Sequence, residues 1–131
     1  MVLLYATKST RNSIIALLGC LEQRGIKAEL VEDEKELLKK SKDEIVCMSI
    51  LSTEFWKISE LAKKLKQKAK LLIAGGPHAT ADPESVLRAG FDIAVIGEGE
   101  ESLPELILSE DRKDVRGIAY LGKRLVFTGR R

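Results

Sequence analysis

The sequence is short of the residues from which metal centres and disulfide frameworks are built. Its 131 residues include two cysteines and one histidine. Metal sites need several ligands, so a solitary imidazole is a poor basis for one. Cys20 and Cys47 fall in a helix-like and a strand-like segment, where a buried free thiol in a reducing cytoplasm is the expected state. The sequence therefore indicates neither a disulfide scaffold nor a metal-ligand cluster of its own.

An excess of one charge and long apolar runs are also absent. Basic residues number 22 and acidic residues 20, so the net charge is +2 and gives no electrostatic argument for nucleic acid as a partner. No apolar run approaches the ~20 residues that a membrane-spanning helix requires. The first residues lack the basic segment and cleavage site of a secretory signal. We therefore expect a cytoplasmic protein that binds neither membranes nor nucleic acid.

The chain consists mainly of short apolar strands that alternate with amphipathic helices. Strands are predicted at residues 2–6, 27–31, 44–51, 70–74 and 91–96. Helices are predicted at 13–24, 33–40, 55–65, 83–89 and 100–108, with Pro104 in the first turn of the last one. Five consecutive strand–helix units favour an α/β fold with a parallel sheet covered on both faces. We predict a flavodoxin-like, five-stranded parallel sheet with the strand order 2-1-3-4-5.

The last part of the chain departs from this alternation. Two apolar segments, at residues 117–121 and 125–128, flank Gly122-Lys123-Arg124, which is typical of a β-hairpin. We therefore divide the chain into an α/β domain at residues 1–109 and a C-terminal hairpin extension at 110–131. A two-stranded hairpin is marginally stable alone, so we expect the extension to lead into a downstream domain of a longer protein.

The specialised residues are concentrated in the loops that leave the carboxyl ends of the strands. Right-handed crossovers place all of these loops on one edge of the sheet. Two adjacent glycines at a strand end permit a tight turn and the close approach of a large group. Asp82 and Pro83 then predict a helix start. We expect a cleft between the first and third strands, where the strand order reverses, bordered by the loops at residues 7–12, 49–53, 75–80 and 97–100.

The sequence of these loops resembles that of the cobalamin (vitamin B12)-binding domain family. That family carries Ser-x-Leu after its third strand and Gly-Gly after its fourth; this chain has Ser49-Ile50-Leu51, followed by Thr53, and Gly75-Gly76. The longer stretches at residues 75–84 (Gly-Gly-Pro-His-Ala-Thr-Ala-Asp-Pro-Glu) and 97–101 (Gly-Glu-Gly-Glu-Glu) look more specifically like the N-terminal domain of B12-binding radical SAM proteins. The resemblance covers roughly residues 1–109.

The resemblance implies cobalamin as the ligand and a radical SAM domain downstream as a partner in the same polypeptide. An iron–sulfur cluster and S-adenosylmethionine would belong to that downstream domain, because Cys20 and Cys47 are too few and too far apart for its cysteine triad. Many cobalamin domains carry Asp-x-His-x-x-Gly after the first strand, with the histidine as lower ligand of cobalt. Residues 7–13 here contain neither histidine nor glycine. The resemblance therefore implies cobalamin with its base off the cobalt and no protein histidine in its place.

The candidate cofactor-binding residues lie in the four loops. They are Thr7, Ser9, Thr10, Ser49, Leu51, Thr53, Gly75, Gly76, Pro77, His78, Gly97 and Glu98. Several have simpler explanations: Leu51 in packing, Thr53 as a helix N-cap, His78 in a structural or rim position, and Glu98 as an acid favoured by a helix dipole. No nucleophile–base pair, metal cluster or carboxylate pair is visible, so no catalytic residue is assigned.

Two alternative functions remain open from the sequence. The hydroxyl-rich loop at residues 5–13 feeds a helix N-terminus, an arrangement that cradles phosphate, which makes an FMN-binding domain a rival. The later loops, however, lack the aromatic side chains that bracket a flavin ring and offer Pro77 and His78 instead. The second alternative is a cofactor-free flavodoxin-like domain that is used for protein contact.

Overall fold

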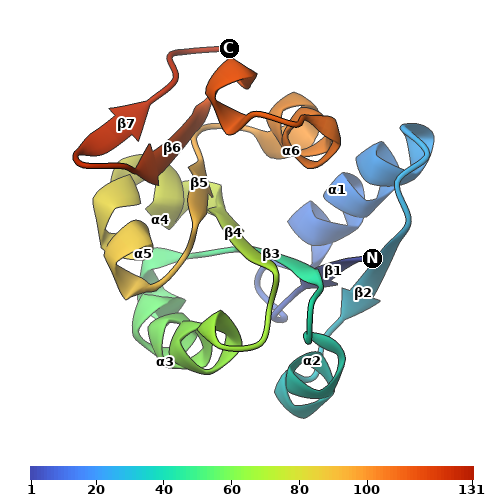
Figure 1. The fold of residues 1–131 in the computed structure, drawn as a ribbon. Helices are drawn as coiled ribbons and strands as arrows, with labels where there is room; N and C mark the ends of the chain where they lie inside the picture. Colours follow the sequence, from blue (N-terminus) through green and yellow to red (C-terminus); the bar gives the residue numbers. More distant parts are fainter.

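A seven-stranded sheet forms the middle layer of the protein in a computed structural model that describes residues 1–131 (Figure 1). The strand order is β2-β1-β3-β4-β5-β6-β7. The first five strands are parallel, whereas β6 and β7 run antiparallel to their neighbours. The strands are β1 (Val2–Tyr5), β2 (Ala28–Val31), β3 (Ile45–Ser49), β4 (Leu71–Gly75), β5 (Ile93–Val95), β6 (Ile118–Leu121) and β7 (Leu125–Phe127).

The order predicted for the first five strands is confirmed, but the prediction of a five-stranded sheet with a separate hairpin is wrong. The hairpin exists, and its strand β6 pairs with β5 through Ala94–Ala119 and Val95–Ile118. Ile118 and Ala119 are each 1% exposed or less. Pairing with β6 satisfies the backbone groups that β5 would otherwise leave open at the edge of the sheet, so the hairpin continues the sheet instead of packing beside it.

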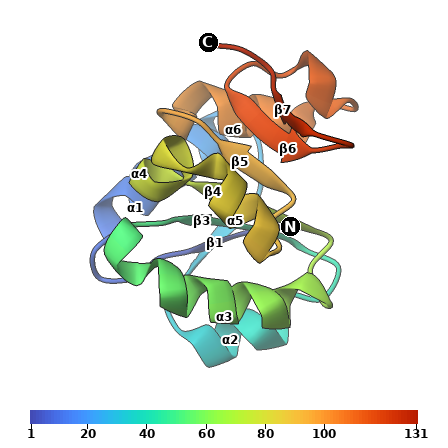
Figure 2. The ribbon, with the colours of Figure 1, turned by 90° about the vertical axis from the view of Figure 1, so that its left-hand side faces the viewer.

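Helices cover both faces of this sheet (Figures 1 and 2). They are α1 (Arg11–Gln23), α2 (Glu34–Lys40), α3 (Phe55–Lys66), α4 (Gly76–Ala81), α5 (Pro83–Ala89) and α6 (Gly99–Leu108), with 3₁₀ turns η1 (Ser52–Glu54) and η2 (Arg112–Asp114). In Figure 2, α1 and α6 lie on one side of the sheet and α2 and α3 on the other. The buried residues accordingly form two apolar clusters, one per face. No helix has the length and apolar character needed to cross a membrane.

Local sequence signals account for the ends of several helices. The Asp33 carboxylate accepts a hydrogen bond from the Glu36 backbone N–H and caps α2. The Asp82 carboxylate likewise accepts from the Ser85 N–H at the start of α5, as the Asp-Pro pair predicts. Helix α5 ends at Gly90, whose φ of +122° is a conformation that glycine adopts without strain.

Two local predictions are wrong. The stretch after Gly75 was predicted as a turn, but residues 76–81 form the short helix α4, because Gly76 takes a φ of +88° and Pro77 then fits the first turn. Pro104 was predicted in the first turn of the last helix. That helix begins at Gly99, with Glu98 as its N-cap, so Pro104 lies inside it.

Candidate functional site

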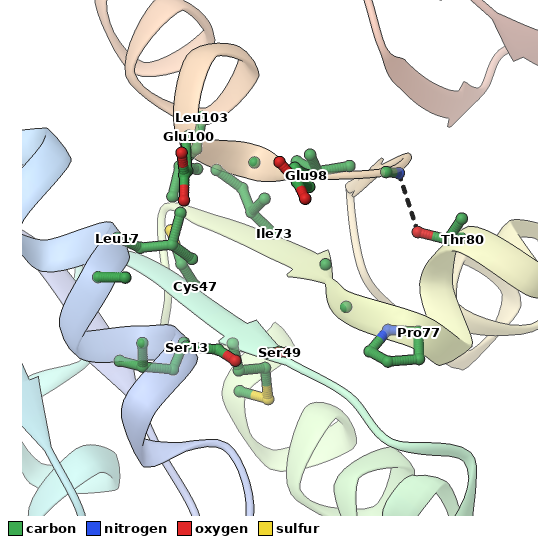
Figure 3. A pocket seen from close by; sticks show the side chains of 18 of the residues that line it. Ser13, Leu17, Cys47, Ser49, Ile73, Pro77, Thr80, Glu98, Glu100 and Leu103 are labelled. Carbon is green, nitrogen blue, oxygen red and sulfur yellow. Dashed lines mark hydrogen bonds between the residues drawn. The ribbon is translucent and has the colours of Figure 1, made fainter.

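A cavity of about 710 Å³ opens at the carboxyl edge of the sheet, on the face covered by α1 and α6 (Figure 3). Its floor comes from β3, β4 and β5, and its walls come from α1 and α6. Helix α4 and the segment Gly97–Glu100 form its rim. No residue of β1 lines it. The predicted edge of the sheet is therefore right, but the cavity lies over β3 to β5 and not between the first and third strands.

The deep end of the cavity is lined by apolar side chains. Cys47 and Ile73 are paired residues of β3 and β4, and with Val95 of β5 they form the floor. Leu103 of α6 and Leu17 of α1 close the sides. All of these except the half-buried Leu17 are 3% exposed or less. Side chains alternate between the two faces of a strand, so these strand residues share the α1/α6 face.

The one thiol in the floor is chemically inert. Burial raises the pKa of Cys47 from its ordinary 9.0 to about 12. The thiolate is the form that binds metals and attacks electrophiles, so at neutral pH Cys47 acts as a small apolar side chain. No group of three or more His, Cys, Asp or Glu side chains is arranged to hold a metal ion.

Polar groups are gathered at the mouth of the cavity. Ser13 of α1 and Ser49 at the end of β3 both line it, with Glu98 and Glu100 on the rim. Ser49 is half-buried and the other three are exposed. The Thr80 Oγ1 atom accepts a hydrogen bond of 2.9 Å from the Gly97 N–H (Figure 3). This bond ties the segment that carries both glutamates to helix α4.

The two adjacent glycines serve different purposes. A Cβ atom on Gly75 would meet only the Val95 Cβ, at 3.8 Å, so the space beside it belongs to the cavity. A Cβ on Gly76 would lie 2.3 Å from the Ser49 Oγ and 2.9 Å from the Ile50 N atom, at a φ of +88°. Gly76 is therefore required by the close approach of α4 to β3. The space that the sequence argument expected beside both glycines is found beside Gly75.

Of the first loop, only Asn12, which begins the polar side of α1, lines the cavity, and residues 7–11 do not reach it. Among these residues the Thr7 N–H donates to the Thr10 Oγ1 atom at 3.0 Å, and the Thr7 hydroxyl donates to the Glu54 carboxylate at 3.1 Å. Thr10 is buried and Ser9 is exposed. The loop thus uses its threonine hydroxyls internally and has a carboxylate against it, which disfavours a phosphate there. The sequence argument for FMN loses its main support.

Three further candidates also lie away from the cavity. The His78 ring shares a hydrogen bond with the Ser52 hydroxyl at Nδ1 (2.8 Å) and another with the Ser85 hydroxyl at Nε2 (2.9 Å). It stacks on Phe55 with 4.2 Å between ring centroids. These contacts support the structural explanation for His78. Leu51 precedes η1 and is half-buried.

Thr53 is not the helix N-cap that the sequence suggested. It lies inside the turn η1, and the N-cap of α3 is Glu54, because the extra turn delays the start of the helix.

Six of the twelve candidates therefore line the cavity: Ser49, Gly75, Gly76, Pro77, Gly97 and Glu98. Sequence reasoning placed Asn12 and Ser13 in the loop that leads into the first helix but did not list them as cofactor contacts, and it missed Leu17 and the floor residues. Crossover handedness gives the edge at which loops gather, but it does not say which face of the sheet is hollow. A usable signal was present in Asn12-Ser13, two small polar residues at the start of a predicted helix.

Comparison with known proteins identifies the family of this chain. The family model described as "B12 binding domain" matches residues 10–107, which is more than half of the chain. The chain belongs to the B12-binding domain family. The resemblance seen in Ser49-Ile50-Leu51 and Gly75-Gly76 is thereby confirmed at the level of the family, and the match supports a cobalamin-binding module.

Relatives of this B12-binding domain are longer proteins. An uncharacterised protein of Methanopyrus kandleri is 52% identical over 58 residues, which are 44% of this chain and 10% of that protein. An uncharacterised methyltransferase of Synechocystis is 35% identical over 75 residues, 57% of this chain and 14% of that protein. The chain thus spans a small part of the curated relatives it matches.

A solved structure shares the fold of the domain. It is the N-terminal domain of a hypothetical protein from Thermotoga maritima, with a TM-score of 0.62 and 38% sequence identity, and the match covers 75% of this chain and 83% of that one.

Proposed function

We propose that this domain binds cobalamin, with the nucleotide tail of the ligand in the cavity between α1 and α6. The observation that carries the proposal is the change in lining from a buried apolar floor to a polar mouth. Such a cavity suits a ligand with an aromatic end and a hydrogen-bonding body. Ser49 and Gly75 are paired residues of neighbouring strands at its mouth, so the two motifs of the family meet at one point.

The residues of the domain act as a holder. The Ser13 and Ser49 hydroxyls are placed to hydrogen-bond the polar part of the tail, while Ile73, Val95 and Leu103 exclude water from its end. The Thr80–Gly97 hydrogen bond keeps the rim segment in place. When bound, the cobalt centre would supply the methyl-transfer or electron chemistry, and the protein supplies burial and orientation.

We also propose that the base of the tail, held in the cavity, is off the cobalt, and that no protein histidine takes its place on the metal. His78 is the only histidine in the chain. Both of its ring nitrogens are engaged by serine hydroxyls, and it does not line the cavity.

Beyond the domain itself, we propose that it is the N-terminal part of a B12-binding radical SAM protein. The Gly97–Glu101 segment and the much greater length of the relatives support this context. Reading the gene downstream of Arg131 tests it. A cysteine triad of the form Cys-x-x-x-Cys-x-x-Cys within several dozen codons would support the assignment, and a stop codon directly after Arg131 would refute it.

Cobalamin binding is tested by mixing the purified chain with hydroxocobalamin and recording the visible spectrum after gel filtration. We expect the corrin to co-elute with the protein in the base-off form, and His78→Ala to leave its axial-ligand bands unchanged. FMN, run in parallel, should not co-elute. If no corrin co-elutes, the holder is refuted and the cofactor-free contact domain is favoured. If His78→Ala shifts the bands, the statement about histidine is wrong.

A further inference from the structure

The end of the cavity offers only apolar contacts to a ring that enters it. Cys47, Ile73, Val95 and Leu103 surround it, and each is 3% exposed or less. The single heteroatom among these side chains is the Cys47 sulfur, which stays a protonated thiol because burial raises its pKa to about 12. The lining side chains that hydrogen-bond well, such as Ser13 and Glu98, are exposed at the mouth.

The backbone N–H and C=O groups of the floor residues are also engaged, because they hydrogen-bond to neighbouring strands. Cys47 is a ladder partner of Ile73, and Ile73 is in turn a ladder partner of Ile93 in β5. Interior strands of a sheet spend their N–H and C=O groups on their neighbours. Neither the floor side chains nor the paired main chain of Cys47 and Ile73 therefore provide a strong hydrogen-bonding partner at the end of the cavity.

We propose that the cavity selects corrinoids by the base that ends the nucleotide tail, and that it prefers an apolar aromatic base to a purine. This inference rests on the proposed function and adds to it the class of ligand. A cresol ring loses no hydrogen bond on entering the apolar end, and a methylated benzimidazole loses only the one at its free ring nitrogen. Adenine would lose water from its amino group and ring nitrogens without replacement, which weakens binding by roughly 10- to 100-fold.

The test compares two cobamides that differ only in this base, one ending in cresol and one in adenine. Cresol has no nitrogen with which to bind cobalt, whereas adenine has, so the fraction of the adenine form with its base on the metal is read from its visible spectrum and its dissociation constant is corrected for it. Dissociation constants measured by equilibrium dialysis should favour the cresol form by about tenfold or more. Equal affinities, or tighter binding of the adenine form, would overturn the preference. If neither cobamide nor cobalamin binds, the proposed function itself fails.

A matched pair of variants locates the selectivity in the cavity. Val95→Thr keeps the size of the side chain and adds a hydroxyl at the floor, so it should reduce the ratio of the two affinities at least threefold. Val46→Thr makes the same change in the apolar cluster on the opposite face of the sheet and should leave the ratio as it is. Should Val95→Thr fail to fold, Cys47→Ser introduces a hydroxyl at the neighbouring floor position. A ratio that does not respond to the floor substitution, or that changes equally in Val46→Thr, would contradict the inference.

Discussion

At the scale of single residues, Gly75 and Gly76 are neighbours in the sequence but face different surroundings. The sequence alone suggests that both make room for a ligand. In the structure a Cβ atom added to Gly75 would point into the cavity, whereas one added to Gly76 would clash with the Ser49 hydroxyl and the Ile50 backbone. Substitution therefore separates a binding effect from a folding effect at adjacent positions.

We expect Gly75→Val to fold and to weaken cobalamin binding roughly tenfold or more, because its methyl groups fill the mouth of the cavity. Gly76→Ala should instead lower the free energy of unfolding by about 2 kcal/mol or more, from the strained φ and the clash with β3. Urea unfolding and equilibrium dialysis measure the two effects. Gly19→Ala, at an exposed glycine inside α1 with nothing within 4 Å, is the control: it should leave binding unchanged and raise the free energy of unfolding by about 0.5–1 kcal/mol. A destabilised Gly75→Val, or a Gly76→Ala as stable as the wild type, would contradict the assignment of a binding role to Gly75 and a folding role to Gly76.

The two cysteines should differ sharply in reactivity. Both are free, but Cys47 is buried and Cys20 is only half-buried, less than the sequence led us to expect. Because the pKa of Cys47 is raised to about 12, its thiolate is scarce below pH 11. With iodoacetamide at pH 8, we expect Cys20 to be alkylated first and Cys47 to remain unmodified in the folded protein. Peptide mass spectrometry reads out both sites, and equal labelling would contradict the burial of Cys47.

At the scale of elements, helix α4 connects two parts of the site, the end of β3 and the rim segment Gly97–Glu100. It begins at Gly76 against the end of β3, where the His78 N–H donates to the Ile50 carbonyl oxygen at 3.0 Å. On its next turn Thr80 holds the Gly97 N–H. This short helix therefore fixes the distance between the end of β3 and the rim segment that leads into α6.

Removing the bond from α4 to the rim should affect binding more than stability. In Thr80→Val the Gly97 N–H loses its partner but, since Gly97 is exposed, water can replace it. We expect cobalamin to bind about three- to tenfold more weakly, the range of one hydrogen bond, with the free energy of unfolding nearly unchanged. Thr53→Val, an exposed threonine outside the cavity, should change neither quantity. If both variants bind equally well, the rim does not depend on this bond.

Helix α4 also shows where sequence reasoning stops. Apolar runs and turn residues predicted every parallel strand, because these signals are local and strongly periodic. The strand order came instead from the flavodoxin-like closure typical of five consecutive strand–helix units. The α4 helix was missed because Gly-Gly-Pro is typical of turns, and only the contact with β3 stabilises a helix of six residues there. Likewise Thr7 and Ser49 look equally suitable as ligand contacts in the sequence. Packing of Glu54 against Thr7 and the hollow beneath α1 distinguish them, and neither is written in local sequence.

At the scale of the whole molecule, the hairpin is part of the core and not an appendage. Ile118 is fully buried in the cluster beneath α6, while Leu125 on the outermost strand is 43% exposed. The antiparallel pairing of β6 with β5 joins segments more than twenty residues apart, which a hydrophobic pattern does not specify. The sheet that shapes the cavity therefore depends on residues beyond the 1–109 boundary predicted from the sequence.

We expect Ile118→Ala to lower the free energy of unfolding by about 2–5 kcal/mol, since it leaves a void in a closed core. Leu125→Ala, the control on the exposed edge of the same hairpin, should cost no more than about 0.5 kcal/mol. Urea denaturation of the two variants provides the comparison. Similar small losses for both would mean that the hairpin is only loosely attached to the sheet.

The most direct test of the account is a map of amide chemical-shift changes in the ¹⁵N-labelled chain on addition of hydroxocobalamin, which is diamagnetic. The account predicts saturable shifts concentrated at Ser13, Ser49, Gly75, Gly97 and Gly99, around the cavity. Amides of α2 and the β7 edge should remain where they are. Shifts centred on the Thr7–Arg11 loop, or no shifts at all at millimolar ligand, would contradict the claim that this cavity receives the cobalamin tail.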